Sequence, residues 1–355
     1  MPPKPSGSQR VSLRDVARVV GVSHVTVSLA LRHDPRVSLE RQQEIAAAAE
    51  KLGYRPDPML SSLSAYRQSK HKLAIRSAVA WINQWEDPKA LRRLHEFDAY
   101  WNGARDAAET LGYRLEEFVL TKDLTVPRLQ KILLTRNVRG ILIPPHRDGL
   151  NLQDFDWSNF SIVRFGASVK HPRAHIVTSD QTKCGALAFS QAHKVGYERI
   201  GYVSGRGFER NTKGNFRAGY LSSQDDLTPL ERHLPPFVAE DGETEVQIRE
   251  ALSRWLKKYK PDALICTEGR FCECLKKLGY EVPRDVGVAT ISLLDGNFDA
   301  GVDQNSYEIG RVAMSTLAGL VHQNERGIPE HCRRILVEGR WVDGKSLPQR
   351  TQCPK

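Results

Sequence analysis

The first apolar residues of the chain recur with a helical period. They stand at positions i, i+3, i+4 and i+7, as Leu13, Val16, Ala17 and Val20. This spacing predicts a short helix with one apolar face. Ser12 can cap its first turn, where the carboxylate of Asp15 also favours a helix N-terminus, and Gly21 is expected to end it.

Two further periodic segments complete a three-helix module. A helix is predicted over residues 24–31, with Ser23 as its cap and with Val27 and Ala30 facing inward. A third helix begins at Ser38 and carries an apolar stripe formed by Ile45, Ala48, Ala49 and Leu52. Two short helices joined by a glycine turn and braced by a third form a helix-turn-helix, whose second helix enters the major groove of DNA.

From residue 76 the pattern changes to short apolar runs that alternate with helical segments. The runs read SAVAWI, LEEFVL, GILIPP, SIVRFGAS, HIVTSD, IGYVSG, ALICTE and GVATIS, with helices predicted near 99–111, 127–136 and 185–195. Strands of this length between helices predict parallel βαβ units. Their order predicts two similar α/β lobes, with the chain crossing near residues 178–183 and returning near 301–306. Such sheets bind ligands beyond the carboxyl ends of their strands, here in the cleft between the lobes.

The positive charge of the chain is concentrated near its start. The 355 residues carry a formal net charge of +10. Residues 1–76 contain 13 Lys and Arg against 6 Asp and Glu, whereas the other residues contain 39 against 36. A basic helical module attached to a nearly neutral remainder predicts a polyanionic partner for that module.

Composition points to a folded protein in a reducing compartment. Hydrophobic residues make up 40% and charged residues 26% of the chain, as in ordinary globular proteins. No apolar run is long enough to span a membrane, and the polar start MPPKPSGSQR does not resemble a secretory signal. The cysteines are scattered, and Cys272 and Cys274 lack the spacing of a metal site. We therefore expect a cytoplasmic protein with free thiols and without a metal or other cofactor.

The N-terminal motifs resemble those of a known family. Residues 11–56 contain Leu13-x-Asp15-Val16-Ala17, Gly21-Val22-Ser23, Thr26-Val27-Ser28, Val37-Ser38 and Gly53-Tyr54-x-Pro56. In this order, and without a gap, they resemble the DNA-binding head of the LacI/GalR family of transcription repressors. The resemblance implies that the hydroxyl groups of Ser12, Ser23, Thr26 and Ser38, near the helix starts, hold DNA phosphates together with nearby backbone amides and Tyr54.

The same resemblance places the base-reading residues on the second helix. It implies that His24, Val25, Ser28 and Leu29 face the base edges, and Leu13 and Arg32 complete the predicted DNA-binding set. Many family members carry polar or basic side chains where Val25 and Leu29 stand. Valine and leucine can only pack on thymine methyl groups or exclude other bases, and Arg32 is expected to add phosphate affinity.

A short helix is predicted directly after Pro56. Asp57 can cap it and Pro58 suits its first position, but at about two turns it is marginal alone in water. It resembles the family's hinge helix, which folds on operator DNA. This implies that Leu63, with Leu60 in a lesser role, wedges into the minor groove and kinks the duplex. The alternative is a linker helix whose leucines pack on the effector domain.

The remaining residues resemble the family's effector domain, which is related to periplasmic sugar-binding proteins. The matching phrases lie at residues 195–200, 261–263 and 282–288, and ILVEGRWVDGKSL stands where the family has its closing strand. The sequence also lacks common catalytic motifs, since no G-x-S-x-G, P-loop, H-E-x-x-H or G-x-G-x-x-G motif stands in a strand–helix context. We predict no catalytic residues.

Two departures from the family pattern concern the effector site. The family commonly has an Arg three residues before a Gly-aromatic pair, but here Phe216 precedes Gly219-Tyr220, and Glu268-Gly269 replaces an Asn-Asp pair. We expect Phe216 and Trp85 to stack on the ligand, and polar contacts to come from Asp180, Glu268 and Gln304. Alternatively, Phe216 belongs to the core and the ligand is held elsewhere in the cleft, or no ligand is bound.

These observations predict a small all-α helix-turn-helix head and a two-lobe α/β body with parallel sheets, like that of periplasmic binding proteins. The predicted division is a disordered leader over 1–10, the head over 11–56, a hinge helix and linker over 57–75, and the body over 76–355. The predicted function is that of a dimeric transcription repressor that binds double-stranded operator DNA and a small molecule, such as a carbohydrate. A solute-binding protein or a sugar-modifying enzyme would explain the body but not the head.

Overall fold

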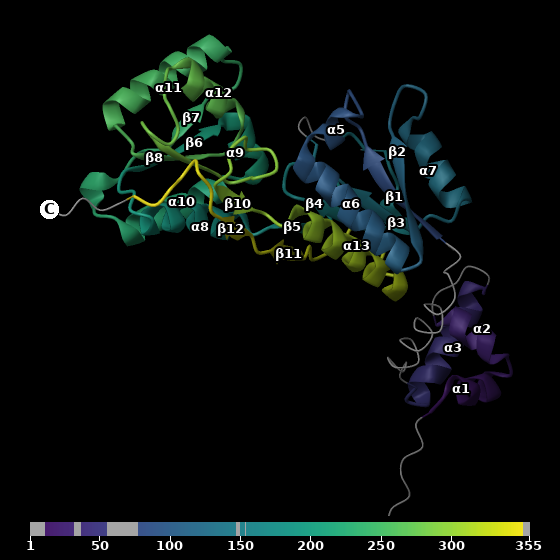
Figure 1. Cartoon of the computed structure of the whole chain (residues 1–355). Helices are drawn as coiled ribbons and strands as arrows, with labels where there is room; N and C mark the ends of the chain where they lie inside the picture. Colours follow the sequence, from purple (N-terminus) through teal and green to yellow (C-terminus); the bar gives the residue numbers. More distant parts are fainter. Residues whose placement is uncertain (1–10, 32–36, 55–76, 147–149, 153, 351–355) are drawn as a thin grey trace, which may run out of the picture. The chain divides into compact units, whose positions relative to one another are not determined.

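The computed structural model describes residues 11–31, 37–54, 77–146, 150–152 and 154–350 (Figure 1). The chain divides into two compact units, which we call the head and the body. The predicted leader at residues 1–10 and the predicted hinge segment at 57–75 lie outside the described residues. Within the described residues, no helix is long and apolar enough to cross a membrane.

The head contains the three predicted helices, α1 (Leu13–Val20), α2 (His24–Ala30) and α3 (Leu39–Lys51). Helix α2 ends one residue earlier than the sequence predicts, and Ser38 caps α3 instead of belonging to it. The inward faces form a single core of Val16, Ala17, Val27, Ala30, Val37, Ile45 and Ala49. The helix-turn-helix prediction is therefore confirmed for the described residues.

The first lobe of the body, the N-lobe, is built on a six-stranded sheet in which all paired strands are parallel. In spatial order its strands are β11 (Arg334–Val337), β5 (His175–Ser179), β4 (Ser161–Phe165), β3 (Gly140–Ile143), β1 (Ser77–Asn83) and β2 (Tyr113–Val119). Helices α6 (His95–Thr110) and α13 (Ser306–Gln323) cover one face, and α7 (Val126–Thr135) covers the other. The short helices α5 (Ala90–Arg93) and η1 (Trp157–Asn159) lie in connections.

The second lobe, the C-lobe, repeats this architecture. Its sheet runs β12 (Arg340–Val342), β10 (Gly301–Asp303), β9 (Gly287–Thr290), β8 (Ala263–Cys266), β6 (Ile200–Gly205) and β7 (Phe237–Ala239), with only β10 and β12 antiparallel. Helices α8 (Gln181–Lys194) and α10 (Asn215–Leu227) cover one face, and α11 (Glu245–Tyr259) and α12 (Arg270–Lys277) the other. Helix α9 (Arg206–Thr212) and the turn η2 (Leu230–Arg232) complete the lobe.

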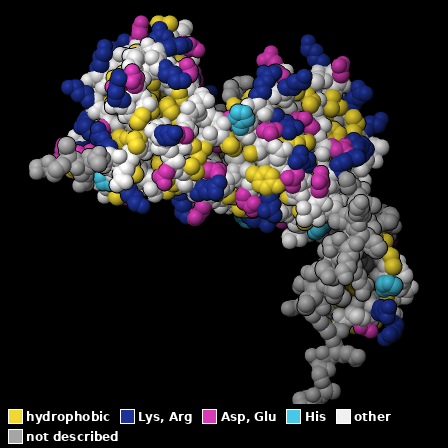
Figure 2. Space-filling model, viewed as in Figure 1, with side chains coloured by type: hydrophobic (Ala, Val, Ile, Leu, Met, Phe, Trp, Pro, Cys, Tyr) yellow, Lys and Arg dark blue, Asp and Glu magenta, His cyan; other side chains and the backbone are white. Residues whose placement is uncertain are grey.

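The chain passes between the lobes three times. The crossings after β5 and after β10 lie where the sequence predicts them. The third crossing was not predicted. The sequence predicts a single closing strand, but this segment is divided into β11 in the N-lobe and β12 in the C-lobe. Val337 pairs with Ser179 of one sheet, and Arg340 already pairs with Asp303 of the other. Basic and acidic side chains are interspersed over the visible face of the body, as its small net charge predicts (Figure 2).

Candidate DNA-binding surface and ligand cavity

Helix α2 of the head separates a buried face from an exposed one. Val27 and Ala30 are almost completely buried in the head core, whereas His24 is exposed and Val25 has 52% of its surface accessible. Leu29 is only half-buried and packs against the core, so it offers a smaller apolar surface than Val25. Val25 is therefore the apolar side chain of this face that is best exposed for contact with a thymine methyl group.

The hydroxyl groups predicted to hold phosphates differ in whether their hydrogen is free to donate to a phosphate oxygen. The Oγ of Ser23 accepts a hydrogen bond from Thr26 N (3.1 Å) and lies 2.9 Å from the Thr26 hydroxyl. The Oγ of Ser38 accepts from Arg41 N at 3.4 Å. Capping uses an oxygen lone pair, so at least one hydroxyl hydrogen remains for a phosphate at each of these helix starts.

Ser12 is different, because its hydroxyl already donates to Oδ2 of Asp15 at 2.6 Å. The backbone N–H of Ser12 donates to the same oxygen at 2.9 Å. The two bonds, helped by the nearby Arg18, lower the pKa of Asp15. Ser12 would have to release this bond before its hydroxyl could donate to a phosphate.

The other predicted DNA-binding residues are placed only in part. Arg32, Leu60 and Leu63 lie outside the described residues, and so does the side chain of Ser28. Tyr54 and Leu13 are half-buried and pack against the head core.

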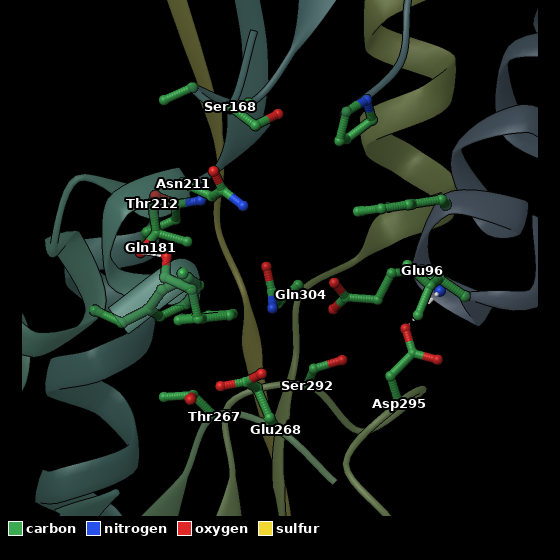
Figure 3. Close-up of a pocket in the computed structure, with 18 of the residues that line it drawn as sticks. Glu96, Ser168, Gln181, Asn211, Thr212, Thr267, Glu268, Ser292, Asp295 and Gln304 are labelled. Atoms are coloured by element: carbon green, nitrogen blue, oxygen red, sulfur yellow. Dashed lines mark hydrogen bonds between the residues drawn. The ribbon is translucent and has the colours of Figure 1, made fainter. Parts of the chain in front are cut away.

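The body contains a cavity of about 680 Å³ between its two lobes (Figure 3). Strands β3, β4, β8 and β9 lead into its wall at their carboxyl ends, as expected for a ligand site in parallel sheets. These segments contribute Pro145, His146, 166–168, 267–270, Ser292 and Asp295. Helix α6 and the residue before it add Leu94, Glu96, Phe97 and Tyr100, and α9 and α10 add Phe208, Arg210, Asn211, Thr212 and Phe216. The size and the mixed apolar and polar wall suit a small organic ligand.

Three of the five predicted effector residues line this cavity, namely Phe216, Glu268 and Gln304. Phe216 is 2% exposed and packs on Phe208, with ring centroids 5.7 Å apart, so it belongs both to the lobe core and to the cavity wall. Gln304 is largely occupied, since its Oε1 accepts from Ser179 Oγ (2.6 Å) and its Nε2 donates to Ile291 O (2.9 Å).

Trp85 and Asp180 are not among the residues that line the cavity. The indole N–H of Trp85 donates to Pro145 O at 2.9 Å, and its ring lies 6.3 Å from that of Phe97. Trp85 thus contacts two residues of the wall without lining the cavity itself. Asp180 caps helix α8, where its carboxylate accepts from Lys183 N at 3.1 Å.

Asp295 and Glu96 are cavity residues that the sequence reasoning did not identify. Asp295 follows the carboxyl end of β9, a position where a polar residue is itself a signal for a ligand site. Both of its oxygens accept backbone bonds from the start of α6 in the other lobe, from His95 N (2.9 Å) and Glu96 N (3.2 Å). A carboxylate of the C-lobe therefore caps a helix of the N-lobe. No local pattern marks Glu96, because only the fold turns the start of α6 toward the cavity.

The charged groups of the cavity are in very different states. Arg210 pairs with Asp241, and Arg270 lies 3.1 Å from Glu268. Glu96 has no such ion pair among the described residues, and burial raises its pKa to about 7. The hydroxyl of Ser292 offsets part of this rise, whereas the negative charges of Asp295 and Asp303 add to it.

His146 contributes no positive charge to the cavity. Its Nδ1 lies 2.8 Å from Pro144 O, and its Nε2 accepts from Gln84 N at 3.0 Å. These two bonds require a neutral ring with the proton on Nδ1. Burial lowers the pKa of His146 to about 4, which keeps the ring neutral near pH 7. Within the described residues, no group of His, Cys, Asp and Glu is arranged to hold a metal ion.

Comparison with known proteins agrees with this architecture. Residues 12–57 match the family model described as bacterial regulatory proteins, lacI family, and residues 189–347 match the periplasmic binding protein-like domain. The HTH-type transcriptional regulator MalR of Streptococcus pneumoniae is 24% identical over 351 residues, which cover 94% of this chain and 99% of MalR.

Two solved structures show the same fold over nearly the whole length. A complex of the transcriptional regulator CelR with cellobiose has a TM-score of 0.55 and 18% identity, and covers 95% of this chain and 100% of that one. The lac repressor dimer bound to operator and the anti-inducer ONPF has a TM-score of 0.53 and 16% identity, and covers 96% and 100%. These two structures show the shared fold. The family-model matches over residues 12–57 and 189–347, with the match to MalR over nearly the whole length, show that the chain belongs to the LacI family, whose members are DNA-binding transcriptional regulators and not enzymes.

Proposed function

We propose that this regulator binds a pseudo-palindromic operator as a homodimer and that a small molecule in the body cavity sets its affinity for DNA. The observation that carries the proposal is the cavity of about 680 Å³ at the carboxyl ends of strands from two lobes, in a chain that also has a helix-turn-helix. A two-fold symmetric protein matches a two-fold symmetric operator. The complexes of CelR with cellobiose and of the lac repressor with operator support both halves of the proposal. We place the protein in the cytoplasm, where its DNA lies.

In the head, the roles divide between phosphates and bases. Ser23, Thr26 and Ser38 hold phosphates. Ser38 keeps its hydroxyl hydrogen after capping α3, and of the bonded pair Ser23 and Thr26 one hydroxyl hydrogen stays free to donate. Val25, exposed beside His24, packs on base edges and favours thymine. Leu63, in the segment 57–75 that joins head and body, acts as the minor-groove wedge.

In the body, aromatic and polar groups act together on the ligand. Phe97, Tyr100 and Phe216 offer apolar faces, and Glu268 with Asn211 offers hydrogen-bonding groups. A carbohydrate combines an apolar ring face with hydroxyl groups and fits such a wall. Since the ligand contacts both lobes, its binding stabilises one arrangement of the lobes over another. The change in lobe arrangement then alters the affinity of the protein for DNA.

The DNA half of the proposal is tested by footprinting the full-length protein on genomic DNA of the organism that encodes it. We expect discrete protected sites with two-fold symmetry, whose affinity falls steeply with salt concentration. Thr26→Ala should weaken binding to such a site about fivefold, the value of one hydrogen bond, while Thr110→Ala in the body leaves it unchanged. Protection without discrete sites would contradict sequence-specific binding.

The ligand half is tested by measuring the fluorescence anisotropy of the footprinted operator in the presence of a panel of metabolites. At least one compound should shift the operator affinity of the full-length protein. Phe216→Ala should abolish that shift and leave ligand-free operator binding intact. A shift that survives Phe216→Ala and also Glu268→Ala would place the ligand outside the cavity.

A further inference from the structure

Among the described residues, four carboxylates line the cavity, and three of them are already compensated. Asp241 pairs with Arg210, Glu268 pairs with Arg270, and Asp295 accepts two backbone N–H groups. Glu96 is the fourth. Figure 3 shows its carboxylate pointing into the cavity toward Gln304, whereas the carboxylate of Asp295 points back to the start of α6.

A second polar group of the cavity wall is also unused, and it comes from the opposite lobe. Ser292 follows β9 of the C-lobe and is only 7% exposed. Among the described residues, its Oγ has no hydrogen-bond partner of regular geometry, although it lies beside Glu96 closely enough to influence that carboxyl group. A buried hydroxyl without a partner is costly, so a ligand atom that reaches it gains affinity.

The charges around Glu96 decide what kind of ligand group fits there. From the C-lobe, Asp295 and Asp303 face it, and Asp303 is itself paired with Arg340 at 2.8 Å. From α6 and α8, Tyr100 and Cys184 face it, and burial raises the pKa values of both groups, so they stay neutral near pH 7. Glu96 therefore lies in a negative potential without a cation of its own among the described residues.

We propose that Glu96 and Ser292, one from each lobe, form a subsite for a protonated amino group of the effector. An ammonium group can donate to a carboxylate oxygen of Glu96 and to Ser292 Oγ at once, and its charge compensates the carboxylates around it. A hydroxyl group could bridge the same two atoms but would leave that charge uncompensated, and a phosphate or a carboxylate would be repelled. The proposal deepens the proposed function and rests on it.

The proton of Glu96 makes this subsite dependent on pH. An ammonium group binds the ionised carboxylate, and the pKa of Glu96 in the free protein is about 7. The affinity for an amine should therefore rise about tenfold per pH unit up to pH 7 and level off above it. Glu96→Gln keeps the shape of the side chain but cannot ionise, so it should remove this dependence.

The test uses the full-length protein and pairs of amines with their N-acetyl derivatives, in which the charge is lost. The pairs are glucamine, galactamine and ethanolamine with their N-acetyl forms and putrescine with its diacetyl form, all of them alkyl amines that stay protonated at pH 8. Glucose and glucose 6-phosphate serve as neutral and anionic references. Binding is measured by calorimetry at pH 6 and pH 8. We expect at least one amine to bind about tenfold more tightly than its acetylated form at pH 8, and to lose about tenfold in Glu96→Gln. Glu109→Gln, the same change at an exposed site of α6, is the control.

The possible outcomes separate this subsite from the proposed function. If neutral or anionic compounds bind best and Glu96→Gln binds them as tightly as the parent, the subsite is wrong while the cavity remains the effector site. If an amine binds but its affinity is the same at pH 6 and pH 8, Glu96 is not its partner. If no compound binds in the cavity and none shifts operator affinity, the subsite and the effector function both fail.

Discussion

In each lobe of the body, two helices of one layer pack through the same kind of contact between a glycine and a backbone carbonyl. The two helices of the N-lobe are far apart in the sequence, whereas those of the C-lobe are close together. In the N-lobe, Gly103 of α6 faces the carbonyl oxygen of Tyr307 on α13, and Gly310 faces that of Tyr100. In the C-lobe, α8 and α10 repeat the arrangement: Gly185 faces Phe216 O, and Gly219 faces Thr182 O. In each case the carbonyl belongs to the residue three positions before a glycine. The absence of a side chain lets the two helix backbones touch, as in other close helix pairs.

The difference lies in how the partners meet. Helices α8 and α10 are separated by one strand and one short helix, whereas four strands of the N-lobe and all of the C-lobe except β12 lie between α6 and α13. Loop-closure entropy disfavours the longer connection, so the N-lobe layer is expected to form later than that of the C-lobe. The same glycine contact therefore joins a helix pair that is close in the sequence and one that is distant. Only the distant pair, α6 and α13, makes the folding of the N-lobe depend on the chain segment that forms the C-lobe.

Adding one methyl group at these contacts should have the largest effect. A Cβ at Gly310 would overlap Tyr100 O, and backbone cannot move aside as a flexible side chain can. We expect Gly310→Ala to cost about 3 kcal/mol and to lower Tm by roughly 5–10 °C, measured by calorimetry. Gly219→Ala should cost a similar amount in the C-lobe. Gly319→Ala is the matched control on α13, because nothing lies within 4 Å of its Cβ, and it should be neutral or slightly stabilising.

Double variants test whether the contacts are paired as described. Gly103→Ala with Gly310→Ala should cost less than the sum of the single changes, since both separate the same two helices. Gly310→Ala with Gly219→Ala should be additive, because the changes lie in different lobes. Additivity within the α6–α13 pair would contradict a shared contact.

The raised pKa of Glu96 gives the N-lobe a stability term that depends on pH. Folding raises this pKa from 4.5 to about 7, so the folded state binds the proton more tightly than the unfolded state. Stability is therefore lost as pH rises from 4.5 to 7 and is constant above that range. Glu96→Gln should be more stable than the parent by about 2 kcal/mol at pH 8 and nearly equal near pH 4.5, measured by urea unfolding. An equal difference at both pH values would contradict this origin.

The bond between Asp295 and the start of α6 is a direct contact between the lobes. Asp295→Ala removes the acceptor of His95 N and Glu96 N, and should lower the stability of the body by about 1–2 kcal/mol. Asp226→Ala, at an exposed site of α10, is the control. Thermal unfolding measures the loss. A destabilisation no larger than that of the control would show that the cap contributes nothing to holding the lobes.

The glycines of the head differ from those of the body and should give the smallest effect. Gly21 ends α1 with φ 70°, and nothing lies within 4 Å of a Cβ built on it. Its conformation, not its size, is what the head needs. Gly21→Ala should cost about 1 kcal/mol and Gly21→Asn less, because asparagine tolerates this region. Circular dichroism of head unfolding measures both, and equal costs would count against a conformational cause.

Much of the head could be predicted because its determinants are local. Ser23 and Ser38 bond to backbone groups three residues away. Val16, Val27 and Ile45 each belong to an apolar set that repeats at helical spacing within its own helix. Such relations are written in neighbouring residues, so the helices, their caps and the helix-turn-helix could be predicted from sequence alone. The alternation of strands and helices in the body and two of its three crossings could be predicted for the same reason.

Which residues line the cavity depends on the tertiary structure, because the wall is built from segments that are far apart in the sequence. Trp85 and Phe216 are both aromatic residues that could stack on a ligand. Only the packing places Phe216 in the cavity wall, whereas Trp85 is hydrogen-bonded to Pro145 and does not line the cavity. The sequence around Phe216 shows a residue three positions before a glycine; the structure shows that its carbonyl packs on Gly185. Glu96 and Asp295 are about 200 positions apart, and neither carries a local signal of the other. The amino acids determined which helices and strands form, whereas the burial, pairing and charge of each cavity residue depended on which segments the fold brought together.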